Sequence, residues 1–186
     1  MDIDRRVDVK EITALVQASQ LGDRAAFGAL VQGFRYSAME LAVRLLWDRE
    51  LADEVVQDSF VKAWIQIKQL RQAGRFRTWF FRIVTNTALN YVRDQRRYTD
   101  LQQNVARTRK DSDVSTRSYT QELNECLQAA LAQLGEKEAL AISLTGLEEL
   151  SYGQAADVMN CSMTSLRQHL FRARKKLKVM LKDYLE

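Results

Sequence analysis

The chain has 186 residues, with no proline and only seven glycines. Proline and glycine are the residues that most often break helices and form the turns between strands, so their scarcity favours helices over a sheet. Apolar residues recur at intervals of three and four along most of the sequence, which is the spacing of the buried face of a helix. The sequence therefore predicts an all-α fold.

Four helices are expected in the first half of the chain. Their apolar residues lie within residues 9–19, 27–45, 51–67 and 80–91, spaced so that the four helices can share one core. Gly22 suits the end of the first helix. Asp23 suits the N-cap of the second, because its carboxylate can accept hydrogen bonds from free backbone N–H groups.

The composition changes at Tyr98. Residues 99–118 are rich in Gln, Arg, Asp, Ser and Thr, and their few apolar residues have no sustained period. Such a segment buries too little apolar surface to offset the entropy lost when it is ordered. We interpret residues 98–118 as a flexible linker between two small helical domains, residues 1–97 and residues 119–186. The alternative is a weakly amphipathic helix that packs on a neighbour.

Residues 151–174 have the spacing of a helix-turn-helix, with a short turn around Asn160. Ser151 and Gln154 form a capping box for the first helix, and Ser162 can cap the second. The second helix of this motif enters the major groove, where Arg reads guanine and Gln reads adenine, while later cations contact phosphates. The alternative is a surface helix with a solvated basic face. The residues expected to contact DNA are Ser162, Thr164, Ser165, Arg167, Gln168, His169, Arg172, Arg174 and Lys175.

A second basic segment, residues 75–97, holds six arginines and one acidic residue, Asp94. Aromatic residues are interleaved with the arginines. Arginine neutralises phosphate and an exposed ring stacks on unpaired bases, so the segment is typical of a surface that binds single-stranded or melted DNA. The aromatic residues are Phe76, Trp79, Phe80, Phe81 and Tyr91; we expect Phe80 and Tyr91 in the core, and Trp79 between the core and a ligand.

Acidic residues gather where the third helix begins, at Asp48, Glu50, Asp53, Glu54 and Asp58. Carboxylates suit a helix N-terminus, and a run of charge is often only a solvated face. This run lies beside Gln57 and Phe60, however, in a chain whose other charged segments are basic. We therefore expect a protein partner here.

Four groups of residues, in this order, resemble the extracytoplasmic-function sigma factors: residues 53–60, residues 76–83 with Asn86, residues 150–152 and residues 171–174. The resemblance implies an N-terminal sigma region 2, a C-terminal sigma region 4 and a loop at residues 70–74 that shapes a pocket for a flipped-out base. It implies that core RNA polymerase binds Asp53, Glu54, Gln57, Asp58 and Phe60. It also implies that the −10 element binds Arg75, Arg77, Trp79, Arg82, Asn86, Asn90 and Arg93, and that the helix-turn-helix reads the −35 element.

The sequence departs from the family pattern at several positions. Gly135 and Glu136 replace a pair that usually includes proline, and residues 164–166 read Thr-Ser-Leu where Gly-Thr-Val is common. Gln72 and Ala73 replace a usual Gly-acid pair in the loop. These departures bear on which promoter is read more than on the function.

Other functions are less consistent with the sequence. The chain has two cysteines, Cys126 and Cys161, and one histidine, His169, which are too few for a disulfide framework or a zinc site. We find no Gly-rich phosphate loop and no nucleophile–base pair, so we expect neither an enzyme nor a cofactor nor a small-molecule substrate. The charged first residues and the lack of a long apolar run predict a cytoplasmic protein without membrane insertion.

Two further expectations concern partners. The family resemblance implies control by an anti-sigma factor. The competing interpretation is a free-standing helix-turn-helix transcriptional regulator, which explains residues 151–174 but gives the acidic and aromatic helices no task.

Overall fold

The computed structural model describes residues 9–101, 130, 133–148 and 150–181. Within these residues every regular element is helical, which confirms the predicted fold class. The elements are α1 (Val9–Gln20), α2 (Arg24–Leu46), α3 (Arg49–Gln66), η1 (Ile67–Gln69), η2 (Ala73–Arg75), α4 (Phe76–Leu101), α6 (Glu136–Ile142), η3 (Ser143–Leu147), α7 (Tyr152–Val158) and α8 (Met163–Met180). Of the three short elements, η1 and η2 are 3₁₀ turns and η3 is a turn of π-helix.

Local signals in the sequence set where the helices begin and end. Gly22 has φ 98° and ends α1, as predicted. The carboxylate of Asp23 accepts hydrogen bonds from the N–H groups of Ala25 at 2.8 Å and Ala26 at 3.1 Å. Asp48 caps α3 in the same way. These caps satisfy backbone donors that no helical partner can reach, so each helix starts at a defined residue.

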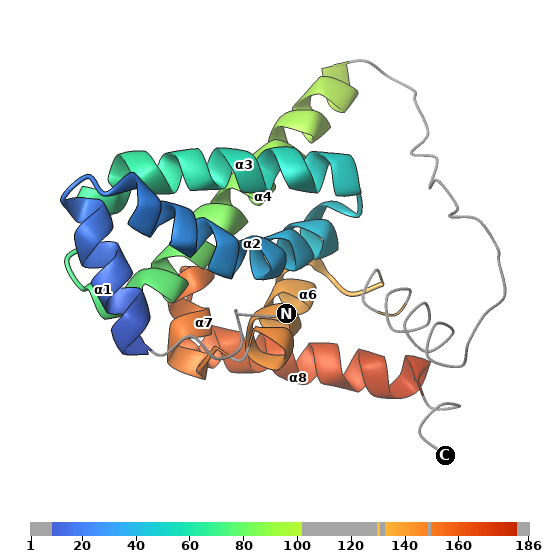
Figure 1. The fold of residues 1–186 in the computed structure, drawn as a ribbon. Helices are drawn as coiled ribbons and strands as arrows, with labels where there is room; N and C mark the ends of the chain where they lie inside the picture. Colours follow the sequence, from blue (N-terminus) through green and yellow to red (C-terminus); the bar gives the residue numbers. More distant parts are fainter. Residues whose placement is uncertain (1–8, 102–129, 131–132, 149, 182–186) are drawn as a thin grey trace, which may run out of the picture.

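The helices α2, α3 and α4 pack together, and α1 lies against α2. Figure 1 shows this group above the C-terminal helices, with the last turns of α4 extending beyond it. The core of the group contains the residues predicted from the apolar spacing, including Leu30, Phe34, Leu41, Val56 and Phe80. The helix α4 ends at Leu101, so residues 98–101 are helical where the sequence predicted a linker. The remainder of that predicted linker lies outside the described residues.

The C-terminal helices are held together by the apolar face of α8. Leu166, Leu170 and Ala173 are buried there, as the sequence predicted. A second tie is electrostatic: Lys176 on α8 donates a 2.7 Å hydrogen bond to the Glu138 carboxylate on α6. Glu138 also accepts a hydrogen bond from the Gly135 N–H, at 3.1 Å. The Lys176 hydrogen bond, aided by the Gly135 N–H, lowers the pKa of Glu138 below its ordinary value although burial opposes the shift.

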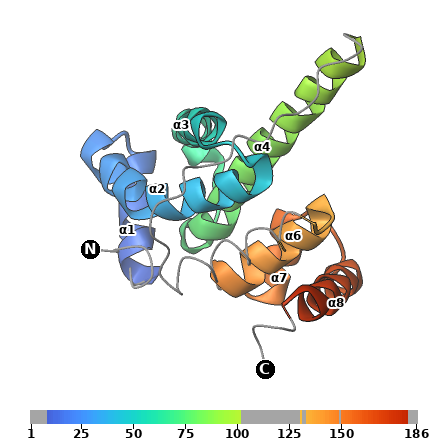
Figure 2. The same cartoon turned by 90° about the vertical axis from the view of Figure 1, so that its right-hand side faces the viewer.

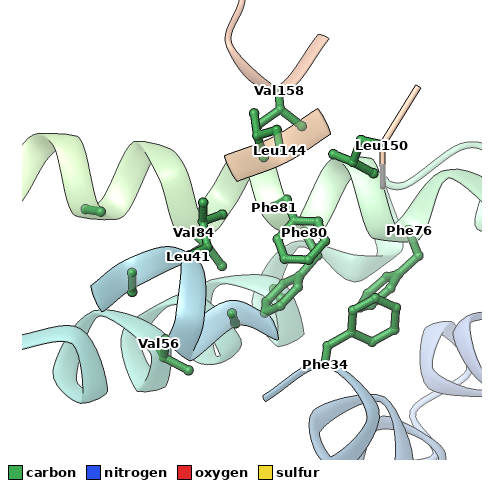
Figure 3. Packing of buried hydrophobic residues seen from close by; sticks show 14 of the residues in the cluster. Phe34, Leu41, Val56, Phe76, Phe80, Phe81, Val84, Leu144, Leu150 and Val158 are labelled. Atoms are coloured by element: carbon green, nitrogen blue, oxygen red, sulfur yellow. The ribbon is translucent and has the colours of Figure 1, made fainter. Parts of the chain in front are cut away.

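The N-terminal and C-terminal helices share one hydrophobic cluster. Leu144, Leu150 and Val158 belong to the same cluster as Phe81 and Val84 on α4. Figure 3 shows these C-terminal side chains against α4, and Figure 2 shows α6, α7 and α8 grouped on one side of it. The packing of η3, α6 and α7 against α2 and α4 is called the closed arrangement below.

No described helix combines the length and the apolar character that would let it cross a membrane.

Candidate nucleic-acid interface

One face of α4, together with the residue just before it, forms a polar and basic stripe. The positions 75, 79, 82, 86, 90 and 93 follow each other at intervals of three and four, so their side chains share a face. Arg75, Arg82, Asn86, Asn90 and Arg93 are exposed. The stripe places cations and amides together along about five turns, which suits the backbone and base edges of an unpaired strand. We call it the α4 stripe.

Most of the aromatic residues of this segment cannot contact DNA bases. Phe76, Phe80 and Phe81 have no exposed surface. The expectation that these interleaved rings stack on bases is therefore wrong for Phe76 and Phe81, whereas Phe80 is in the core as predicted. Trp79 is half-buried and lies against Phe76, with 5.8 Å between the ring centroids. Tyr91 is partly buried and packs on the core cluster, also as predicted.

Arg77 does not belong to the α4 stripe. It points toward the C-terminal helices, where its Nη2 donates a 2.9 Å hydrogen bond to the main-chain oxygen of Glu148. The Glu148 carboxylate lies 3.8 Å from both Arg77 and Arg44 and is only 5% exposed. The Arg77 guanidinium also lies over the Phe81 ring, 5.7 Å from its centroid. Arg77 was predicted to contact DNA, but in this structure its side chain is part of the contact between the two halves.

The turn of the helix-turn-helix also meets the α4 stripe. Arg82 donates a 3.4 Å hydrogen bond to the Asn160 side chain. Asn160 has φ 48°, the left-handed conformation expected where a polar residue ends a helix within a turn. The closed arrangement therefore touches the predicted single-strand surface through Arg77 and Arg82, two residues that no pattern in the sequence connects to the C-terminal half.

The exposed face of α3 combines acidic, polar and apolar side chains. Glu54, Gln57 and Asp58 are exposed, as a partner-binding surface requires. Val61 is 57% exposed and Ile65 is 69% exposed, and both follow Glu54 and Asp58 at helical intervals on the same face. Neither apolar residue was among those expected from the sequence to bind a partner, although their positions between the core residues of α3 could have revealed them. We call residues 54, 57, 58, 61 and 65 the α3 stripe.

Two predicted partner-binding residues differ from the rest. Phe60 is 8% exposed and stacks on Phe80 with 4.6 Å between centroids, so in this structure it supports the surface from beneath, and its contact with a partner stays a prediction. Asp53 is half-buried and accepts hydrogen bonds from Gln57 and from Arg35, the latter at 3.4 Å. Asp53 therefore positions Gln57 rather than projecting freely.

Lys62 links the α3 stripe to α4. Its Nζ lies 3.2 Å from the Asp58 carboxylate and donates a 3.2 Å hydrogen bond to the Thr87 hydroxyl, beside Asn86. Lys62 was not predicted as a site residue, because a single lysine in an acidic helix forms no pattern. Its place between the two stripes adds a cation at the edge of the α4 stripe.

The helix-turn-helix forms as the sequence predicted. Ser151 and Gln154 make the reciprocal hydrogen bonds of a capping box, at 2.9 and 3.2 Å. Ser162 accepts a 3.1 Å hydrogen bond from the Ser165 N–H and caps α8. The buried Ala155 and Ala156 let α7 cross α8 closely. The beginning of α8 is thereby held at a fixed angle with its other face toward solvent.

The exposed face of α8 carries most of the predicted base and phosphate contacts. Residues 164, 167, 168, 171, 172, 175 and 178 lie on it at helical intervals and are exposed. Ser165 and His169 lie on its flank and are half-buried, so the structure gives them less access to DNA than predicted. Arg174 is at the edge, where it donates a 3.0 Å hydrogen bond to the Tyr152 hydroxyl.

Phe171 projects from the middle of this basic face and is 71% exposed. Shallow hollows of about 440 and 460 Å³ lie on its two sides, the first lined also by Tyr152, Arg167 and Lys175, and the second by Thr164, Arg167 and Gln168. Phe171 was not predicted to contact DNA, although residues 171–174 are part of the family resemblance. Its position off the buried stripe of α8 was the signal that it faces solvent.

The described residues contain no group of three or more His, Cys, Asp or Glu side chains placed to hold a metal ion.

Comparison with known proteins places both halves of the chain in one family. The family model for sigma-70 region 2 matches residues 30–98, and the model for sigma-70, region 4 matches residues 124–177. The ECF RNA polymerase sigma-E factor of Haemophilus influenzae is 36% identical over 171 residues, covering 87% of this chain and 90% of that protein. The RNA polymerase sigma-H factor of Pseudomonas aeruginosa is 32% identical over 193 residues, covering 92% and 94%.

Two solved structures are similar along most of the chain. CnrH, in complex with the cytosolic domain of CnrY, has a TM-score of 0.71 and 25% identity, covering 93% of this chain and 98% of that one. The sigma factor RpoE of Bartonella quintana, in complex with the anti-sigma factor NepR, has a TM-score of 0.74 and 23% identity, covering 84% and 96%.

The closed arrangement leads to a prediction about Glu148. Glu148→Ala leaves the guanidinium groups of Arg44 and Arg77 without their shared carboxylate, which we expect to weaken the contact between the halves by about 1–3 kcal/mol. Small-angle X-ray scattering should then show a larger radius of gyration than for the wild type. Glu11→Ala is the matched control, because it removes an exposed carboxylate from α1 and leaves Arg44, Arg77 and Glu148 unchanged. Equal radii for Glu148→Ala and the wild type would show that Glu148 does not hold the halves together.

Proposed function

Because the chain belongs to the sigma-70 family and, within it, to the extracytoplasmic-function sigma factors, we propose that its three exposed surfaces divide the work of starting transcription. As a member of this family the chain binds core RNA polymerase and directs promoter recognition, DNA melting and initiation. Three exposed helix faces support this division of tasks: the acidic and apolar α3 stripe, the basic α4 stripe and the basic exposed face of α8.

The α3 stripe is the proposed polymerase-binding surface. Glu54, Gln57 and Asp58 supply polar contacts, and Val61 and Ile65, which are 57% and 69% exposed, supply apolar area for the partner. A helix face with alternating apolar and acidic positions suits a partner helix that carries apolar and basic side chains. Asp53 and Phe60 act from within the protein by holding Gln57 and the helix in place.

The α4 stripe is the proposed surface for the −10 element. Arg75, Arg82 and Arg93 neutralise the backbone of the melted strand, and Asn86 and Asn90 offer donors and acceptors to unpaired bases. Trp79 contributes the exposed part of its ring. Arg77 can reach DNA only after its contact with Glu148 is broken, so its role requires the two halves to separate.

The exposed face of α8 is the proposed reader of the −35 element. Thr164, Arg167 and Gln168 lie nearest the start of the helix, where base edges are contacted in helix-turn-helix complexes. Phe171 suits an apolar contact with a thymine methyl group, and Arg172, Arg174 and Lys175 suit phosphates. Ser162 serves mainly as the cap of the helix.

Domain limits, location and regulation complete the proposal. We assign region 2 to residues 1–97 and region 4 to residues 119–186, and expect the chain to act in the cytoplasm with its polymerase and to catalyse no reaction by itself. CnrH and the Bartonella quintana RpoE were each solved with a protein partner, in the latter case an anti-sigma factor. An anti-sigma factor is the partner we expect for this chain.

A free-standing regulator is not favoured, because it leaves the α3 and α4 stripes unexplained.

Asp58→Arg tests the polymerase-binding surface. The substitution reverses one charge at the centre of the α3 stripe, so we expect affinity for bacterial core RNA polymerase to fall by at least about tenfold. Glu11→Arg makes the same change of charge on the exposed face of α1 and should leave affinity unchanged. The measurement is a titration of fluorescently labelled chain with core enzyme. Equal affinities for the two variants would remove Asp58 from the interface.

Arg167→Ala tests the −35 reader. If Arg167 contacts a base, the loss should be about 1–3 kcal/mol at one position of the −35 element and relax the preference there. Holoenzyme affinity for a panel of single-base −35 variants gives the measurement. Lys175→Ala provides the comparison, since a phosphate contact weakens binding to all variants alike. A uniform loss with Arg167→Ala would make Arg167 a phosphate contact instead.

A further inference from the structure

The connection between α3 and α4 is a short segment with two buried anchors. Ile67 is 1% exposed and Leu70 is 9% exposed, while Arg71, Gln72, Gly74 and Arg75 face solvent. The loop follows the α3 stripe directly and ends at Arg75, the first residue of the α4 stripe. Any base that is unstacked at this end of the α4 stripe therefore meets the loop.

A side chain from a distant helix holds this loop. The amide nitrogen of Gln20, at the end of α1, donates hydrogen bonds to the main-chain oxygens of Ile67 at 3.0 Å and Leu70 at 2.8 Å. The Ile67 oxygen also accepts a 3.1 Å hydrogen bond from the Leu70 N–H, so Gln20 adds a second hydrogen bond to this turn and ties it to α1. Because both partners are acceptors, only the amide nitrogen can face them, which fixes the orientation of the side chain.

The rest of α1 follows the second part of the loop. A Cβ atom added to Gly74 would lie 3.6 Å from Thr13 Oγ1 and 3.8 Å from Val9 Cγ1, so the backbone of Gly74 runs close to α1. Figure 1 shows α1 beside the segment that leads into α4. The helix α1 therefore braces the loop at both ends: through Gln20 near Leu70, and through Thr13 and Val9 near Gly74.

We propose that Gln20 is a positioning residue for base selection in the −10 element. It holds the backbone from Ile67 to Leu70 so that Arg71, Gln72 and the backbone up to Arg75 form a fixed wall for one unstacked base. The inference rests on the proposed function of the α4 stripe and extends it to a helix that precedes the sigma-70 region 2 match at residues 30–98.

The physical basis is pre-organisation. A loop that discriminates between bases must present its donors and acceptors at fixed positions, because freedom in the loop lets it adapt to the wrong base. The two Gln20 hydrogen bonds span 47 and 50 residues of sequence, so no local interaction can replace them. Loss of both should loosen the loop while leaving the buried face of α1, at Ile12 and Val16, in place.

The test compares holoenzymes assembled from core RNA polymerase and four chains. Gln20→Met keeps the side-chain volume and removes the amide; Gln20→Glu places a carboxylate against two carbonyl oxygens. Gln17→Ala, on the exposed face of the same helix, is the matched control beside the wild type. Each holoenzyme is titrated with single-stranded −10 oligonucleotides that carry each of the four bases in turn at every position, and with a −35 duplex.

We expect both Gln20 variants to lose about tenfold of the preference for the best base at one −10 position, the effect of a hydrogen-bond change of ~1.4 kcal/mol. All variants should bind the −35 duplex with the affinity of the wild type. The control Gln17→Ala should also match the wild type in base preference and in thermal unfolding midpoint. Unchanged base preference in Gln20→Met and Gln20→Glu would overturn the proposal, as would an equal loss for all four bases together with weaker −35 binding. A wild-type holoenzyme with no base preference at any −10 position would refute the proposed function of the α4 stripe itself.

Discussion

The burial of one face of α4 is the interaction on which the other surfaces depend. Phe76, Phe80 and Phe81 have no exposed surface, and Phe34 and Phe60 meet them at centroid distances between 4.6 and 6.4 Å. Rings of this size bury more apolar area than other side chains, so they fix the rotation of α4 about its axis. Once that face is buried, the positions at 75, 79, 82, 86, 90 and 93 have to face outward. The basic face of α4 is therefore exposed because the opposite face of the same helix closes the core.

Both halves of the molecule pack on α4. The C-terminal half covers α4 with apolar residues, but it also buries a carboxylate, that of Glu148, between two arginines at 3.8 Å. Removing charged groups from water costs free energy that offsets much of the attraction between them, so this ion pair makes the contact specific in geometry more than it makes it strong. Such a contact suits two domains that have to bind separate DNA elements when polymerase holds them, and that pack on each other when it does not.

Much of the fold follows from short-range patterns in the sequence. The caps at Asp23, Ser151 and Ser162 and the turn at Asn160 were predictable because each depends on residues within three or four positions. The polar stripes could be read from helical spacing. By contrast, the packing of Phe81 on Phe34 and the pairing of Arg77 with Glu148 join residues that are 47 and 71 positions apart, and no local pattern encodes them. The exposure of Val61, Ile65 and Phe171 was predictable in principle from their places off the buried stripes, whereas the functional roles assigned to single residues remain predictions.

The central claim is that one acidic and apolar helix holds polymerase while two basic helices hold separate parts of one promoter. Sequencing of run-off transcripts, made by purified bacterial core RNA polymerase from a genomic fragment library with and without this chain, tests it most directly. The account predicts new start sites that share two upstream sequence elements at a fixed spacing. Identical start sites with and without the chain would contradict it.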